Sequence, residues 1–134
     1  MTNTTITQSL NSALEALEEL PDSSSILAFV IPSDDSPYFE EIAPESLDQR
    51  LKELVGETSE MLHTRGSMAM GCNYKARTEN QRYNPLGTTA VRKWFSMSDS
   101  ADGTIVLFGT DDQRNITSVE PHKMFDLMEM YLYG

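Results

Sequence analysis

Residues 73–95 hold the side chains best suited to bind a charged ligand. The segment reads NYKARTENQRYNPLGTTAVRKWF, with five basic residues and a single acid in a chain whose formal net charge is −11. Arginine presents a planar fork of donors that fits phosphate or carboxylate, and an aromatic ring presents its face to a base or a cation. The candidate binding residues are Lys75, Arg77, Arg82, Tyr83, Arg92, Lys93 and Trp94. Such a set suits a nucleotide, single-stranded nucleic acid or an acidic protein surface.

The basic residues are concentrated rather than spread along the chain. Residues 64–98 contain six basic residues and one acid, whereas the other ninety-nine residues contain four basic residues and twenty acids. Local charge, more than the total, sets the field that steers a partner. Because the acidic total repels duplex nucleic acid and anionic membranes, we expect neither as a partner.

Three explanations of this basic segment stay open at the level of sequence. Its cations can neutralise acids of the same molecule, although exposed ion pairs contribute only about 0–1 kcal/mol each. They can meet an acidic surface on another protein or on a second copy of the chain. They can also hold a nucleotide or another phosphate-bearing ligand.

Patterns typical of catalysis or metal binding are not found in the sequence. Cys72 is the single cysteine, and neither it nor His63 or His122 lies in a nucleophile motif. No histidine or cysteine pair has zinc-ligand spacing, and the aspartates of residues 99–112 do not match a calcium-binding loop. We therefore expect a non-enzymatic protein with no catalytic residue, metal site or cofactor, and we interpret Cys72 as a small buried core residue.

The cysteine content and the N-terminus bear on location. A lone cysteine excludes an intramolecular disulfide, and the first residues, MTNTTITQSLNS, contain no hydrophobic signal segment. We expect a reducing, cytoplasmic setting, or a virion if the protein is viral.

The apolar pattern predicts helices near the start, the middle and the end of the chain. Residues 6–20 place leucines at helical spacing before Pro21. Residues 46–65 begin with a capping box and carry an apolar stripe. Pro121 begins a third helix, whose expected buried stripe is Met124, Phe125, Met128, Tyr131 and Leu132.

Strands are predicted between these helices. Residues 25–31 form an unbroken apolar run, which is typical of a central strand with both faces covered. Residues 67–77 alternate between apolar and polar types, and residues 89–98 and 104–109 predict two more strands. Short strands are expected at residues 38–42 and 115–119.

Together these elements predict an α+β fold in a single domain spanning residues 1–134, a usual length for one domain. We expect an antiparallel β-sheet of four or five strands, with three α-helices (N-terminal, central and C-terminal) packed mainly on one face. The order of elements resembles that of roadblock and profilin-like domains, a likeness of architecture from which we carry over no function.

Pairing of the predicted strands 67–77 and 89–98 would gather the basic residues on one surface. The eleven residues that join these strands are more than a hairpin loop normally uses, and long loops are often functional. The side chains that this pairing brings together are Lys75, Arg77, Arg82, Tyr83, Arg92 and Trp94.

The sequence thus favours a small acidic interaction protein that acts by docking through residues 73–95. An assembly subunit, an adaptor or an inhibitor would fit, including an accessory or structural protein of a bacterial virus. We expect a protein partner or self-association into a homo-oligomer. The alternative is a module that sequesters or senses a nucleotide or another phosphate-bearing ligand with the same residues.

Overall fold

In the computed structural model of the chain, the described residues are 25–63, 67–73, 75–76, 79, 81–95 and 100–133. The helix predicted over residues 6–20 lies outside them. Six strands and three α-helices make up this described part, which confirms the predicted α+β class.

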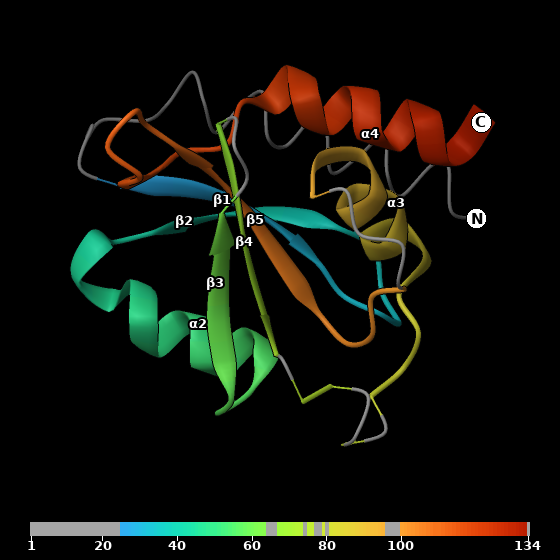
Figure 1. Cartoon of the computed structure of the whole chain (residues 1–134), viewed down its shortest axis with the longest axis horizontal. Coiled ribbons are helices and arrows are strands. Elements are labelled where there is room, and N and C mark those ends of the chain that lie inside the picture. Colours follow the sequence, from blue (N-terminus) through green and yellow to red (C-terminus); the bar gives the residue numbers. More distant parts are fainter. Residues whose placement is uncertain are drawn as a thin grey trace.

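The strands form one antiparallel sheet at the centre of the fold (Figure 1). Their bounds are β1 Ile26–Ile31, β2 Tyr38–Ile42, β3 Ser59–His63, β4 Met68–Asn73, β5 Ile105–Thr110 and β6 Ile116–Thr117. The sheet runs β2-β1-β5-β4-β3, and the short β6 pairs with the end of β5. Five strands therefore make the main path and β6 adds a sixth, compared with the four or five strands that the sequence predicted.

Helices cover both faces of this sheet. They are the single-turn 3-10 helix η1 Pro44–Ser46 and the α-helices α2 Leu47–Val55, α3 Pro85–Trp94 and α4 Pro121–Tyr133. Figure 1 shows α2 on one face and α3 and α4 on the other, and the two hydrophobic clusters divide in the same way. The predicted C-terminal helix is confirmed as α4, whereas the central helix α2 lies on the opposite face from α3 and α4.

The strand β1 lies between these two layers. All six of its residues are buried, which confirms the prediction of a strand covered on both faces. Phe29 and Ile31 belong to the cluster under α3 and α4, and Ala28 and Val30 belong to the cluster under α2. An alternating strand reaches both clusters because its successive side chains point to opposite faces.

In β4, side-chain size differs between the two faces. Met68 and Met70 pack under α3 and α4, as the alternation of the sequence predicts. Ala69 and Gly71 lie on the other face, where α2 packs close to the backbone. A Cβ atom on Gly71 would overlap Cδ1 of Leu51, so a larger residue at this position requires the leucine side chain to move.

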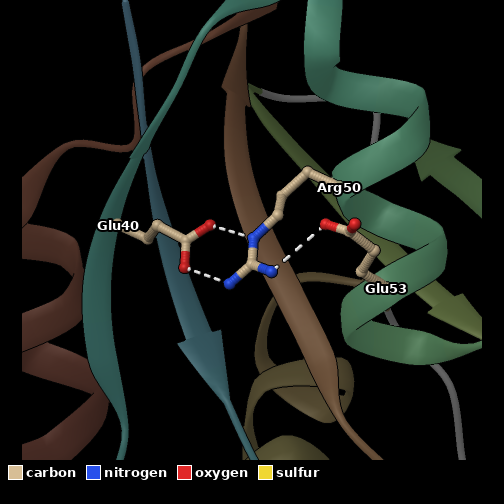
Figure 2. A network of polar contacts seen from close by, with 3 residues as sticks. All are labelled: Glu40, Arg50 and Glu53. Atoms are coloured by element: carbon tan, nitrogen blue, oxygen red, sulfur yellow. Dashed lines mark hydrogen bonds and ion pairs between the residues drawn. The ribbon is translucent and has the colours of Figure 1, made fainter.

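Arg50 joins α2 to the edge strand β2 (Figure 2). Its Nε donates to Oε2 of Glu40 at 2.5 Å, its Nη2 donates to Oε1 of Glu40 at 2.7 Å, and its Nη1 reaches Oε1 of Glu53 at 3.3 Å. The hydrogen bond to Glu40 raises the pKa of Arg50 further above its ordinary value. A forked arginine–carboxylate pair fixes orientation as well as distance, and it orients α2 against the sheet.

The predicted helix over residues 46–65 is wrong in its second half. It ends at Val55, because Gly56 has a φ of 119° and donates its N–H to the carbonyl of Lys52. A glycine with positive φ is a usual helix terminator. Residues 59–63 then form β3, which pairs with β4.

The predicted strand over residues 89–98 is also wrong, since α3 occupies residues 85–94. Oδ1 of Asn84 accepts a hydrogen bond from the N–H of Gly87 at 2.8 Å, and Pro85 follows as the first helical residue. Asparagine followed by proline is a strong helix start. The neighbours of β4 in the sheet are consequently β3 and β5.

The close approach at Gly71 gives a test of the packing of α2. Gly71→Ala should lower the free energy of unfolding by about 1–3 kcal/mol, because the new methyl group overlaps Leu51. In a Leu51→Ala background the same change should cost less, and chemical denaturation of the four proteins gives the coupling. Purely additive effects would show that the two residues do not meet.

Candidate functional site

The helix α3 belongs to a segment between β4 and β5, with described residues 82–95 and 100–103, whose two ends pair with each other; we call this segment the excursion. The N–H of Gly103 donates to the carbonyl of Arg82 at 2.6 Å, and the N–H of Asn84 donates to the carbonyl of Ala101 at 2.8 Å. Tyr83 and Asp102 form an antiparallel bridge between these bonds. The chain therefore enters and leaves the excursion through two short stretches, residues 82–84 and 101–103, which pair with each other and which we call the neck.

Asn84 anchors this neck and is only 1% exposed. Its Nδ2 donates to the carbonyl of Ile31 at 2.9 Å and to the carbonyl of Gly103 at 2.8 Å. Its Oδ1 caps α3 at Gly87. Since the amide has two donors and one acceptor oxygen, every polar atom of this buried side chain is bonded.

Thr88 joins the first turn of α3 to Ala101, where the chain leads toward β5. Its Oγ1 donates to the carbonyl of Asn84 and accepts from the N–H of Ala101, at 2.8 and 2.9 Å. A Cβ atom on Gly87 would lie 2.8 Å from the side chain of Asn84, so the first turn of α3 sits directly against its cap. These contacts hold α3 in a defined position on the body of the protein.

The predicted binding residues on this excursion fall into two groups. Arg82 and Tyr83 lie before α3, where both are exposed, Tyr83 by 53%. Arg92 and Lys93 are exposed in its last turn, and Trp94 is half-buried against the core. A helix of ten residues is about 15 Å long, so the two groups flank α3 rather than form one cluster.

Lys75 lies outside the excursion, and Arg77 lies outside the described residues. The N–H of Lys75 donates to Oδ1 of Asn73 at 2.8 Å, in the turn that follows β4. The predicted arrangement, with these two cations opposite Arg92 and Trp94 on paired strands, is wrong because α3 is a helix and pairs with no strand.

Asn73 is a second buried asparagine that the sequence did not identify. Its Nδ2 donates to the carbonyl of Val55 at 3.2 Å and to Oε1 of Glu79 at 3.0 Å, and its Oδ1 accepts from the hydroxyl of Thr58. A Cβ atom on Gly56 would lie 2.8 Å from this amide. Asn73 thus joins the end of α2 to the chain that leaves β4.

The cations of α3 and its neck have no acidic partner among the described residues. Residues 81–95 contain three basic residues, Arg82, Arg92 and Lys93, and no acid. None of the three forms an ion pair with a described residue, and neither does Arg114, whereas Arg50, Lys52 and Lys123 each pair with a carboxylate. Lys93 instead holds its Nζ 5.6 Å from the ring centroid of Trp94. In the last turn of a helix, cations also interact favourably with the helix dipole, by about 0.3–1 kcal/mol each.

Cys72 is a half-buried member of the core under α3 and α4. Burial raises the pKa of its thiol to about 12, and the charge of Glu60 acts in the same direction. Because the thiolate is the nucleophilic form, a thiol held in its protonated state suits a packing role.

Two further polar contacts lie outside α3, one in the turn between β5 and β6 and one between α4 and the start of β4. Asp111 accepts hydrogen bonds from the N–H groups of Gln113 and Asn115, both at 2.9 Å, and the bonds from Asn115 lower the pKa of this carboxyl. The aspartate therefore orders a turn, as its position between strands suggests. Nζ of Lys123 donates to Oγ of Ser67 at 2.5 Å and ties α4 to the start of β4.

Two further observations concern metals and membranes. Within the described residues, no group of three histidine, cysteine, aspartate or glutamate side chains is placed to hold a metal ion. None of the helices in this part of the chain has the length and apolar character needed to span a membrane.

Comparison with known proteins finds no similar family. No protein-family model matches the chain, and no match is found among curated proteins or solved structures. The likeness in element order to roadblock and profilin-like domains therefore carries no functional information here.

The network of Asn84 can be tested by separating its cap from its donors. Asn84→Ala removes both and should lower the free energy of unfolding by about 2–4 kcal/mol, because two buried carbonyls and the start of α3 lose their partners. Asn84→Asp keeps the acceptor for Gly87 but loses both donors, so it should also destabilise. Denaturant titration gives each value, with Gln113→Ala as the control, because the side chain of Gln113 is exposed and forms no hydrogen bond with a described residue. Wild-type stability of Asn84→Asp would mean that only the cap matters.

The position of Cys72 predicts slow alkylation. At about pH 8, iodoacetamide should modify the native protein roughly a thousandfold more slowly than the unfolded protein, whose thiol pKa is near 8.5. A raised folded-state pKa also means that the stability due to the neutral thiol is present below about pH 8.5. That stability is lost as the pH rises through about 12. Equal alkylation rates in the native and guanidinium-unfolded protein would contradict this burial.

Proposed function

We propose that this protein is a non-enzymatic interaction protein that docks an acidic protein surface on α3 and its neck. The docking residues are Arg82, Tyr83, Arg92, Lys93 and Trp94. The observation that carries the proposal is that three cations without an ion pair to any described residue are displayed on an element held by a fully bonded, buried asparagine.

A fixed position of α3 favours binding, because ordering a mobile segment costs free energy that the contacts must offset. Arginine, tryptophan and tyrosine are the residues most enriched at the energetic centres of protein interfaces. Exposed cations of this kind also raise the rate of encounter with an acidic partner. The acidic remainder of the chain repels other anions, so attraction is confined to this surface.

The start of α3 favours a protein surface over a phosphate group as the ligand. Helix N-termini bind phosphate through free N–H groups. Here Pro85 has no N–H, while the N–H groups of Gly87 and Thr88 already donate to Asn84. The cations at the two ends of α3 are also about 15 Å apart, a span that suits an extended acidic surface.

Assembly subunits, adaptors and inhibitors work through such docking surfaces. The small size and the acidity of the chain are in keeping with an accessory or structural role of this kind, including one in a bacterial virus. In each of these roles, binding itself would be the activity.

The proposal predicts salt-sensitive binding of an acidic peptide. We expect a fluorescein-labelled oligoglutamate peptide to bind in about 0.1 M salt, where charges beyond about 10 Å are screened, and to dissociate in about 1 M salt. Neutralising the three cations in Arg82→Gln/Arg92→Gln/Lys93→Gln should weaken binding about tenfold or more, measured by fluorescence anisotropy.

The matched control is Arg114→Gln, which removes an exposed cation from the turn between β5 and β6. It should bind the peptide like the wild type. Equal binding by the triple variant and the wild type would exclude docking at α3. If the peptide does not bind but a nucleotide raises the melting temperature of the wild type and not of the triple variant, the phosphate-bearing ligand is the correct alternative.

A further inference from the structure

The exposed surface of α2 has a charge pattern opposite to that of α3. Residues 44–57 contain four acids, all exposed, and two basic residues. Both basic residues are already paired, Arg50 with Glu40 and Glu53, and Lys52 with Asp48. These two cations therefore neutralise only part of the negative charge of residues 44–57.

The acids without an ion pair in the described structure stand at the two ends of α2. Glu45 lies in η1, immediately before α2, and Glu57 follows the glycine that ends it; both are exposed. Neither forms a hydrogen bond or an ion pair with a described residue. We call this the α2 surface, defined by Glu45, Asp48, Glu53 and Glu57.

The two helices that these acids and cations flank are of similar length. α2 has nine residues and α3 has ten, so the two helices are about 13 and 15 Å long. An acid flanks each end of α2, while Arg82 precedes α3 and Arg92 lies in its last turn. Two helices laid side by side can thus satisfy both ends at once, and antiparallel helix dipoles would favour one direction.

The two surfaces lie on opposite faces of the sheet, as Figure 1 shows for α2 and α3. One molecule therefore cannot bring its own α2 against its own α3. The neighbour of α3 in its layer, α4, carries Asp126 and Glu129 as exposed acids, which would repel an acidic surface. Exposed cations also stand elsewhere, as Arg114 does in the turn between β5 and β6, but α3 and its neck hold the largest group of them in the described part of the chain.

Resting on the proposed function, we propose that the acidic partner of α3 is the α2 surface of a second copy of this chain. The contact is heterologous, since each copy contributes a different surface. Repetition of a heterologous contact builds a ring when the rotation closes and an open chain when it does not. Each copy then contributes one α2 surface and one α3 surface to the assembly, which is the basis of the test.

The test uses two variants that each disable one surface. The α3 variant is Arg82→Gln/Arg92→Gln/Lys93→Gln, and the α2 variant is Glu45→Gln/Glu57→Gln. A control variant, Glu60→Gln/Asp112→Asn, loses the same number of acids elsewhere on the exposed surface.

Sedimentation velocity in about 0.1 M salt measures association as the protein concentration rises. The wild type and the control should form species larger than a monomer, and both should return to monomers in about 1 M salt. Each surface variant alone should need about tenfold more protein to associate. An equal mixture of the two surface variants should form a dimer and nothing larger, because only one intact pair of surfaces remains.

Three outcomes would overturn the proposal. A wild type that stays monomeric at every concentration excludes a second copy as partner, while the oligoglutamate assay still decides the proposed function. If the α2 variant associates as strongly as the wild type, the α2 surface is not the acidic partner of α3. Failure of the mixed variants to form a dimer excludes a contact between these two surfaces.

Discussion

The buried amide of Asn84 is the interaction on which the arrangement of α3 depends. One side chain donates to the end of β1 and to the chain entering β5, and it caps α3 at the same time. Leaving a buried polar group without a partner costs about 1–3 kcal/mol, so the loss of any of these three bonds would be costly. The position of the exposed cations is thus a consequence of a residue that has almost no contact with solvent.

Asn73 repeats this arrangement at the point where the chain leaves β4. It bonds to the last residue of α2, to the following turn and to Glu79. The two asparagines stand at the two ends of the connection between β4 and α3, and each ties it to an element that is distant in sequence. Because both amides are buried and bonded, the connection enters and leaves at fixed places despite its length.

The parts of the fold that the sequence predicted well are those set by hydrophobic period. The run over β1 and the methionines of β4 were assigned correctly because burial on one or both faces determines residue type directly. The wrong predictions concern the places where backbone conformation determines where a helix begins or ends. Gly56 lies inside the predicted helix 46–65, yet its positive φ ends α2. Asn84 and Pro85 lie in the loop predicted between strands 67–77 and 89–98, although an asparagine cap followed by proline begins helices. Of the candidate site, the identity of the cations was predictable, but their separation by a helix was not.

The pair formed by Arg50 and Glu40 has a consequence for how the sheet meets other chains. β2 is an edge of the main sheet, and an exposed edge invites another strand to add by backbone pairing. Charged side chains on such an edge disfavour this pairing, because an added strand would have to desolvate them. Here Glu40 is held in place by a forked bond from the neighbouring helix, and Glu41 beside it is exposed. The arginine that orients α2 therefore also protects this side of the protein against aggregation.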